Sequence, residues 1–221
     1  LRSLLRFARS QGLIASPLEE HLPRFSRYRL SSIPYYLTIS EIQKVLMTID
    51  RSTVQGKRNY AIILLLATYG MRIGELTHLQ LEDIDWRHER LILRRTKGRC
   101  SLQLPLLPPV AEAIIDYLQH ARPKTHHRQL FLTLKAPYGP LHRNAPRIFS
   151  KAICRAGLDP PHRGSTIFRH SLASRLVQDS QPLVTVAQVL GHASIDNTAI
   201  YTKITLNELR QVALDLTEVT A

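Results

Sequence analysis

Cysteine and long apolar runs are scarce in this sequence. Only Cys100 and Cys154 occur among its 221 residues, far apart and at no metal-ligand spacing. Neither a disulfide framework nor a cysteine-bound metal is therefore expected, and free thiols indicate a reducing compartment. The most apolar stretch, residues 62–69, is far shorter than the roughly 18 residues that span a bilayer. We expect a soluble, cytoplasmic protein with no membrane segment.

Several catalytic motifs are also absent. The sequence has no glycine-rich phosphate loop ending in Lys-Ser/Thr, no His-Glu-x-x-His and no cluster of cysteine and histidine. The adjacent His126 and His127 occur in a polar stretch that is typical of a solvated loop. We therefore expect neither a metal nor a cofactor.

Acidic residues are few relative to basic ones. The 30 Lys and Arg against 17 Asp and Glu give a formal net charge of +13, and the basic residues are spread along the chain. Lysine and arginine supply most of the sequence-independent affinity of proteins for DNA. This charge favours a nucleic acid as partner, with an anionic membrane surface as the weaker rival and a basic but inert surface as a third interpretation.

The chain begins with a short helical pattern and a proline-containing stretch. Residues 1–14 place leucines near one helical face, and Gly12 ends the pattern. Three prolines among scattered arginines make residues 16–37 an extended, basic linker. Because the chain starts at Leu1 without a methionine, we expect it to be a fragment of a longer protein, with the first helix belonging to an upstream unit.

A compact domain is expected from residue 38 to residue 221. Thr38 and Glu41 have the spacing of a capping box, and a buried helix is expected over residues 57–70. Alternating leucines on both sides of Lys97 predict a β-hairpin with the lysine at its tip. Further helices are predicted over residues 109–121, 143–156, 167–179, 183–190, 194–201 and 206–216. The fold class is therefore mainly α with a small antiparallel β-sheet (α+β).

The residues that could carry chemistry are a set of cations and one phenol. They are Arg72 in TYGMRIGEL, Lys97 at the hairpin tip, Arg169 in IFRHSLASRL, and His192 and Tyr201 in LGHASIDNTAIYTK. Taken singly, each has an ordinary structural explanation. Arginines bind helix ends or carboxylates, a Gly-His pair can end a helix, and a tyrosine can pack with its hydroxyl at the surface.

Taken together, these segments resemble the catalytic domain of the tyrosine recombinase (phage integrase) family. The resemblance covers about residues 38–205, and the boxes occur in the family's order: TYGMRIGEL resembles the first arginine box, the lysine hairpin precedes an LPL stretch, FRHSLASRL resembles the second arginine box, and LGHASIDNTAIYTK resembles the nucleophile box. Residues 1–37 resemble the end of the family's core-binding domain and its interdomain linker. The resemblance implies the catalytic-domain fold of this family.

The resemblance also implies a reaction and partners. Members of the family cleave a DNA strand by attack of the tyrosine on a phosphodiester, form a 3′-phosphotyrosyl link, and pass the strand to a 5′-hydroxyl without ATP or a metal. The implied partners are double-stranded DNA, further copies of the chain in a dimer or tetramer, and accessory DNA-binding proteins, in a prokaryotic cell. Integration, excision, resolution and transposition all use this chemistry, so the sequence does not choose among them.

Roles for the candidate residues follow from the resemblance. Arg72 and Arg169 are expected to hold the non-bridging phosphate oxygens by charge-assisted hydrogen bonds, and His192 to hydrogen-bond the same phosphate. Lys97 is expected to protonate the leaving 5′-oxygen. Tyr201 is the expected nucleophile, and a phenol with a pKa of about 10 needs a positive field and a proton acceptor.

Two neighbours of the arginines are expected to support them. Glu75 follows Arg72 by three residues, so it would share a helical face with Arg72 and orient its guanidinium. His170 follows Arg169 directly and resembles a supporting residue of the family, although buried structure is an equal interpretation.

One position departs from the family pattern. The second box commonly reads His-x-x-Arg, but Thr166 stands three residues before Arg169. Threonine can donate a hydrogen bond to phosphate but cannot carry a proton near neutral pH. We expect an active enzyme in which Thr166 donates and a water or another side chain takes the proton. The alternatives are that His162 swings in from the preceding loop or that the catalyst is slow or inactive. Ser165 and Thr166 also stand where the next helix needs an N-cap.

Two other functions stay open at this point. A DNA-binding regulator that kept the fold and lost the reaction would fit Thr166, and a relaxing enzyme of the type IB topoisomerase kind would share the chemistry but act alone. The last predicted helix, residues 206–216, carries an apolar stripe. That stripe either packs on its own domain or docks in a neighbouring subunit.

Overall fold

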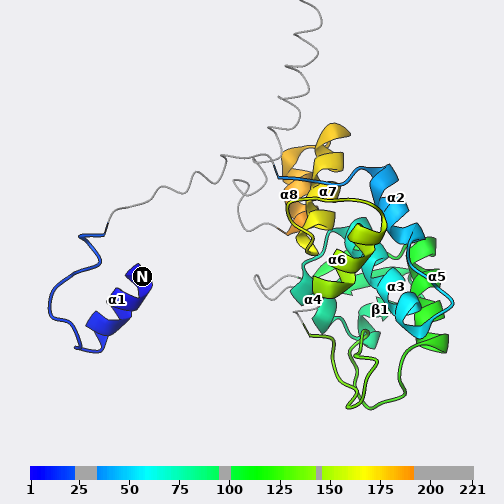
Figure 1. Ribbon diagram of the computed structural model, residues 1–221, viewed down its shortest axis with the longest axis horizontal. Helices are drawn as coiled ribbons and strands as arrows, with labels where there is room; N and C mark the ends of the chain where they lie inside the picture. The colour runs from blue at the N-terminus through cyan, green and yellow to red at the C-terminus, as the bar shows by residue number, and fades with distance from the viewer. Residues whose placement is uncertain (23–33, 95–100, 143–145, 192–221) are drawn as a thin grey trace, which may run out of the picture. The chain divides into compact units, whose positions relative to one another are not determined.

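The computed structural model describes residues 1–22, 34–94, 101–142 and 146–191 (Figure 1). The chain divides into two compact units, Leu1–Ser32 and Ile33–Ala221. In the first unit, helix α1 (Arg2–Ser10) ends just before Gly12, whose φ of 71° is left-handed. The predicted N-terminal helix and its stop are thus confirmed. Arg9 of α1 binds the carboxylate of Glu19 at 3.1 Å.

The second unit is mainly helical, as predicted. Its described helices are α2 (Ile39–Met47), α3 (Val54–Tyr69), α4 (Ile73–His78), α5 (Pro108–His120), α6 (Pro146–Arg155), α7 (Thr166–Gln178) and α8 (Leu183–Leu190). A 3-10 turn, η1 (Leu81–Asp83), leads into an antiparallel sheet in the order β1 (Ile84–Asp85), β2 (Arg90–Leu93) and β3 (Leu102–Pro105). The helices predicted over residues 194–201 and 206–216 and the hairpin tip at Lys97 lie outside the described residues.

Helix α2 begins at the predicted capping box. The hydroxyl of Thr38 accepts the backbone N–H of Glu41 at 3.3 Å, and the Glu41 carboxylate accepts the backbone N–H of Thr38 at 2.8 Å. Two N–H groups that the helix leaves unpaired at its start are thereby satisfied, so the sequence itself sets this boundary.

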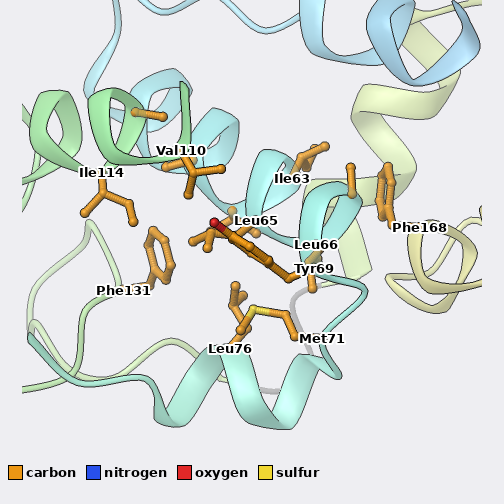
Figure 2. Packing of buried hydrophobic residues seen from close by; sticks show 14 of the residues in the cluster. Ile63, Leu65, Leu66, Tyr69, Met71, Leu76, Val110, Ile114, Phe131 and Phe168 are labelled. Atoms are coloured by element: carbon orange, nitrogen blue, oxygen red, sulfur yellow. The ribbon is translucent and has the colours of Figure 1, made fainter. Parts of the chain in front are cut away.

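Helix α3 forms the centre of the domain. It packs against α2, α4, α5 and α7, and its apolar side chains are buried on most of its circumference (Figure 2). Its last residue, Tyr69, accepts the N–H of Leu107 at 3.1 Å and donates to the carbonyl of Pro105 at 2.8 Å. Burial raises the pKa of the Tyr69 phenol, which stays a neutral donor. The end of α3 is therefore joined to the sheet and to the start of α5.

Helices α7 and α8 enclose a smaller apolar cluster. It consists of Leu172, Ala173, Val186 and Leu190. The segment that enters the domain packs here as well, because Tyr36 contacts this cluster and the backbone N–H of Leu37 donates to the Ser171 hydroxyl at 2.8 Å. The linker end and the helix that carries Arg169 are thus in direct contact.

Some short elements were not predicted. Helix α4, η1 and β1 contain six, three and two residues, too few to show a helical or alternating pattern. Helix α3 also begins three residues before the predicted position 57, since the hydroxyl of Thr53 caps it by accepting the N–H of Gly56 at 3.0 Å. Among the described residues, no helix combines the length and the apolar character that crossing a bilayer requires.

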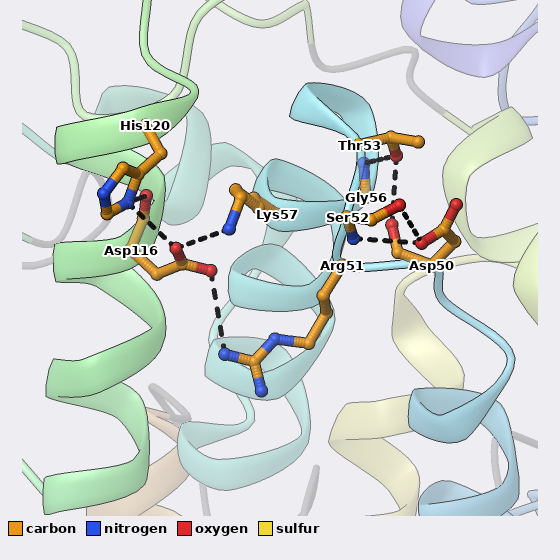
Figure 3. Close-up of polar contacts among 8 residues, drawn as sticks. All are labelled: Asp50, Arg51, Ser52, Thr53, Gly56, Lys57, Asp116 and His120. Atoms are coloured by element: carbon orange, nitrogen blue, oxygen red, sulfur yellow. Dashed lines mark hydrogen bonds and ion pairs between the residues drawn. The ribbon is translucent and has the colours of Figure 1, made fainter.

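A cluster of charges joins α3 to α5 (Figure 3). The Asp116 carboxylate binds Lys57 at 2.6 Å, His120 at 3.1 Å and Arg51 at 3.7 Å. Burial opposes the ionisation of Asp116, but the hydrogen bond and charge of Lys57, with further help from His120 and Arg51, outweigh it and lower the pKa of the carboxyl group. The cluster therefore stabilises the packing of these two helices.

Replacing Asp116 with asparagine should lower the free energy of unfolding by about 1–2 kcal/mol, because the half-buried Lys57 loses its charged partner. A lowered folded-state pKa means that the contribution is complete above about pH 5 and disappears as the pH falls through that pKa. Urea unfolding of both proteins between pH 3 and pH 7 measures this difference. Glu112→Gln, at an exposed position of the same helix, is the matched control, and an equal loss in the control would contradict the role of the cluster.

Candidate active site

Arg72 stands between α3 and α4. Its backbone is extended (ψ 149°) at the N-cap of α4, and its side chain is 44% exposed. The buried Glu75 carboxylate accepts the backbone N–H of Arg72 at 2.7 Å and its guanidinium at 3.0 Å. The predicted pairing of these two residues is present, although Arg72 caps the helix and does not share a face within it. The Glu75 carboxylate thus binds both the backbone and the guanidinium of Arg72.

Arg169 lies on α7 and is buried, with 7% of its surface exposed. Its guanidinium donates to the carbonyl of Gly70 at 2.8 Å and also to the carbonyl of Leu190. Gly70 ends α3 in the left-handed region (φ 58°), and a Cβ there would lie 2.8 Å from the Leu172 side chain. A glycine at position 70 therefore allows α3 to end in this conformation, in which the Gly70 carbonyl accepts a hydrogen bond from Arg169.

The two arginines meet at the C-terminal end of α8. Arg72 donates to the carbonyl of Gly191 at 3.1 Å, and Arg169 donates to the preceding carbonyl, that of Leu190. Gly191 is left-handed (φ 65°) and ends the helix. The carbonyls at a helix C-terminus carry a partial negative charge, which favours two guanidiniums beside them. Residues about a hundred positions apart are thereby brought to one place.

Two guanidiniums at one place can bind a tetrahedral oxyanion. Guanidiniums present several N–H donors in a fixed plane, which matches the oxygens of a phosphate group. Arg72 is partly exposed whereas Arg169 is held firmly within the fold. Lys97, His192 and Tyr201 lie outside the described residues, so the described part of the site consists of the two arginines and their supports.

Thr166 lies one helical turn before Arg169, at the first residue of α7. It is exposed and lines a cavity of about 550 Å³. The other residues around this cavity are Pro34, Tyr35, Pro161, His162, Arg163, Gly164, Ile167 and His170. The cavity therefore separates the end of the linker from the loop that precedes α7.

The capping role predicted for Ser165 and Thr166 is only partly correct. Ser165 is the N-cap residue, but its side chain makes no capping hydrogen bond, and Thr166 is already the first helical residue. The backbone of Ser165 is itself helical (φ −58°, ψ −24°), whereas a capping hydroxyl normally requires an extended N-cap. The predicted capping hydrogen bond from Ser165 is therefore not formed, and Thr166 lies within the helix.

His170 is half-buried beside Arg169. Burial lowers the pKa of its imidazole, and the positive charges of Arg169 and His162 lower it further. A neutral imidazole is the consequence at pH 7. This environment is consistent with both interpretations of His170, as support for Arg169 and as buried structure.

Two glycines of the site escaped prediction as functional residues. The carbonyls of Gly70 and Gly191 accept hydrogen bonds from Arg169 and Arg72. Each glycine follows an apolar helix, which is a recognisable signal for a helix end. Nothing in that local signal, however, specifies which distant side chain binds the carbonyl.

Comparison with known proteins identifies the family. The sequence model of the phage integrase family matches residues 35–208. The chain belongs to the phage integrase family. This phage integrase chain is 41% identical over 218 residues to the integrase/recombinase y4rA of Sinorhizobium fredii, an alignment covering 97% of the chain and 52% of y4rA. The chain thus spans about half the length of that relative.

Two further comparisons agree with this assignment. The phage integrase chain is 31% identical over 221 residues to the tyrosine recombinase XerC of Oceanobacillus iheyensis, covering 96% of the chain and 70% of XerC. Its fold is similar to that of the XerH site-specific recombinase bound to the palindromic difH substrate in a post-cleavage complex. That match has a TM-score of 0.70 and 26% identity, over 82% of this chain and 53% of XerH. The predicted fold class and family are confirmed.

Proposed function

We propose that this chain carries the catalytic domain of a site-specific DNA recombinase that cleaves and rejoins strands through a 3′-phosphotyrosyl intermediate. The observation that carries the proposal is the meeting of Arg72 and Arg169 at the end of α8. A phosphodiester gains negative charge on its non-bridging oxygens as a nucleophile approaches, and two fixed guanidiniums stabilise that charge. We assign residues 38–221 to this domain and residues 1–37 to the end of a core-binding domain and its linker.

The remaining catalytic groups come from the family pattern. Tyr201 is the proposed nucleophile, Lys97 protonates the leaving 5′-oxygen, and His192 hydrogen-bonds the phosphate. His192 follows Gly191 directly in the sequence, which supports a position next to the arginines. Because the phosphotyrosyl link conserves the energy of the broken bond, the reaction requires neither ATP nor a metal.

The proposed partners are duplex DNA and further copies of the chain. A formal charge of +13 favours contacts to the phosphate backbone. The related XerH binds a palindromic substrate, and a palindrome presents the same half-site to two copies of a protein. We therefore propose a dimer or tetramer on DNA in the prokaryotic cytoplasm, with accessory DNA-binding proteins as further candidates.

A nicked suicide duplex tests the proposal. The target sequence is first selected from random duplexes by binding at low salt, and the chain is then incubated with a nicked version of it in the presence of EDTA. We expect a denaturant-resistant protein–DNA adduct, because the small fragment released beyond the nick cannot return to attack it. A pure DNA-binding protein retains the duplex but forms no adduct, and that result would refute the enzymatic proposal.

A second substrate separates recombination from relaxation. Two duplexes of different length that carry the same site are incubated together, and the products are sized. Joining between the two duplexes is expected of a recombinase. Relaxation of a supercoiled plasmid without any such joining would instead support an enzyme of the type IB topoisomerase kind.

The Glu75→Gln variant should form the adduct about 10- to 100-fold more slowly, the equivalent of a charge-assisted hydrogen bond. Glutamine keeps the shape of the side chain but loses the charge that holds the Arg72 guanidinium at 3.0 Å. Single-turnover cleavage of the suicide duplex measures the rate, and circular dichroism confirms folding. Glu112→Gln, at an exposed position of α5, is the control; equal rates in the two variants would show that Glu75 does not position Arg72 for the reaction.

A further inference from the structure

The proposed reaction needs a proton acceptor that the second box does not provide. An attacking phenol must lose its proton as the bond to phosphorus forms, and a side chain with a pKa near neutrality is suited to take it. Thr166 stands where the family pattern has a histidine, and a hydroxyl does not accept a proton near neutral pH. Since Thr166 is exposed at the first turn of α7, an external group can approach it.

His162 is placed to be that group. It lies four residues before Thr166 in the loop that leads into α7, its side chain is exposed, and both residues line the same cavity of about 550 Å³. His170, from the next turn of α7, lines this cavity too. Thr166, Arg169 and His170 are neighbours on α7 because they are spaced by three and four residues. The cavity thus brings an imidazole to the turn of the helix from which Arg169 projects.

The loop that carries His162 is fastened on both sides. Arg163 donates to the Sγ of Cys154 on α6 at 3.0 Å and forms an ion pair with Asp159. On the other side, the backbone N–H of Ile167 donates to the carbonyl of Gly164 at 3.3 Å, which joins the loop to the first turn of α7. His162 therefore lies in the short segment that the Arg163–Asp159 ion pair closes, and Pro161 before it further restricts the backbone.

We infer that His162 takes the proton of the attacking tyrosine, in place of the histidine that the family pattern has at position 166. This inference rests on the proposed function. In cleavage, the Tyr201 oxygen bonds to phosphorus, the bond from phosphorus to the 5′-oxygen breaks, the phenolic proton passes to a ring nitrogen of His162, and Lys97 protonates the 5′-oxygen. In rejoining, the 5′-hydroxyl attacks and returns its proton to Lys97. The bond to the tyrosine then breaks, and protonated His162 returns its proton to the phenolate.

The other imidazole at the cavity is less suited to this step. His170 is half-buried and follows Arg169 directly, and the positive charge of that guanidinium disfavours a second positive charge on a neighbouring imidazole. His162 is exposed and precedes the helix start by four residues, so its ring is open to an incoming group. His162 is therefore the more accessible imidazole at the cavity.

The test measures the loss from His162→Gln in two backgrounds, by single-turnover adduct formation on the nicked duplex. In the natural background we expect a loss of about 100-fold, the lower end of general-base contributions. In a Thr166→His background the family histidine is restored, so the same His162→Gln change should have little effect. His126→Gln, at an exposed position in another loop, should have no effect in either background.

Chemical rescue provides a second readout that a merely structural role would not show. Imidazole added to a His162→Ala variant should restore adduct formation, because the free base can occupy the cavity beside Thr166. A chain that forms the adduct normally with His162→Gln, or a defect that is equal in both backgrounds and insensitive to imidazole, overturns the assignment of His162 alone. An unmodified chain that forms no adduct overturns the proposed function together with this inference.

Discussion

Replacing Arg169 with lysine should slow cleavage about 10²- to 10³-fold, the range seen when one preorganised donor to a developing oxyanion is removed. Lysine keeps the charge but has neither the planar fork nor the reach to hold two acceptors and a phosphate oxygen together. Arg169 is buried and donates to the carbonyls of Gly70 and Leu190. A compact ammonium cannot satisfy both carbonyls in that position.

The same contacts make a loss of stability part of the expected result. Arg169 joins the end of α3 to the end of α8, and leaving one of these buried carbonyls without a donor costs about 1–3 kcal/mol. Cleavage must therefore be measured well below the unfolding transition, with folding verified by circular dichroism. Arg175→Lys, six residues further along the same helix, is the control. A folded Arg169→Lys variant that cleaves like Arg175→Lys would remove Arg169 from the reaction.

Replacing Tyr201 with phenylalanine should abolish the adduct altogether. The change removes a single oxygen and keeps the ring, so packing and DNA affinity are expected to be retained while the nucleophile is lost. Binding of the duplex, measured by fluorescence anisotropy at constant salt, should match that of the unmodified chain. Adduct formation is read from denaturing gels of the same samples.

Tyr69→Phe is the matched control for this substitution. The Tyr69 hydroxyl bridges Leu107 and Pro105, so its loss should reduce stability but leave the adduct in place. Persistence of the adduct in Tyr201→Phe would identify a different nucleophile. Disappearance of the adduct in both variants at a temperature where both are folded would indicate an indirect effect of either substitution.

Local features of the fold were predictable because neighbouring residues produce them. The capping box of Thr38 and Glu41, the glycine stop after α1 and the hairpin strands follow from spacing and alternation, and each is present. The two-residue strand β1 escapes such reasoning because it is too short to show a pattern and forms only by pairing with β2. Its position is determined by the rest of the sheet.

For the arginines of the candidate site, the sequence indicated a local pairing but not the distant contacts. The sequence pattern singled out Arg72, Arg169 and Glu75, and the spacing of Arg72 and Glu75 indicated their pairing. The acceptors at Gly70, Leu190 and Gly191 lie 99, 21 and 119 positions from the arginines that bind them. Contacts over such separations depend on how α3, α7 and α8 pack, which local patterns do not encode. The sequence offered His162 as one alternative near Thr166, and the structure places both residues on the lining of one cavity.

The most direct test of whether the arginines act on the charge of the scissile phosphate is to replace that phosphate with an uncharged group and measure cleavage. The Arg169→Ala variant is incubated with two suicide duplexes that differ only at the scissile position, one with a natural phosphate and one with an uncharged methylphosphonate. If Arg169 stabilises charge on the non-bridging oxygens, the variant should be strongly defective on the phosphate and recover most of its activity on the methylphosphonate. A folded variant that is equally defective on both substrates would contradict the proposal that the two guanidiniums act together on one phosphate.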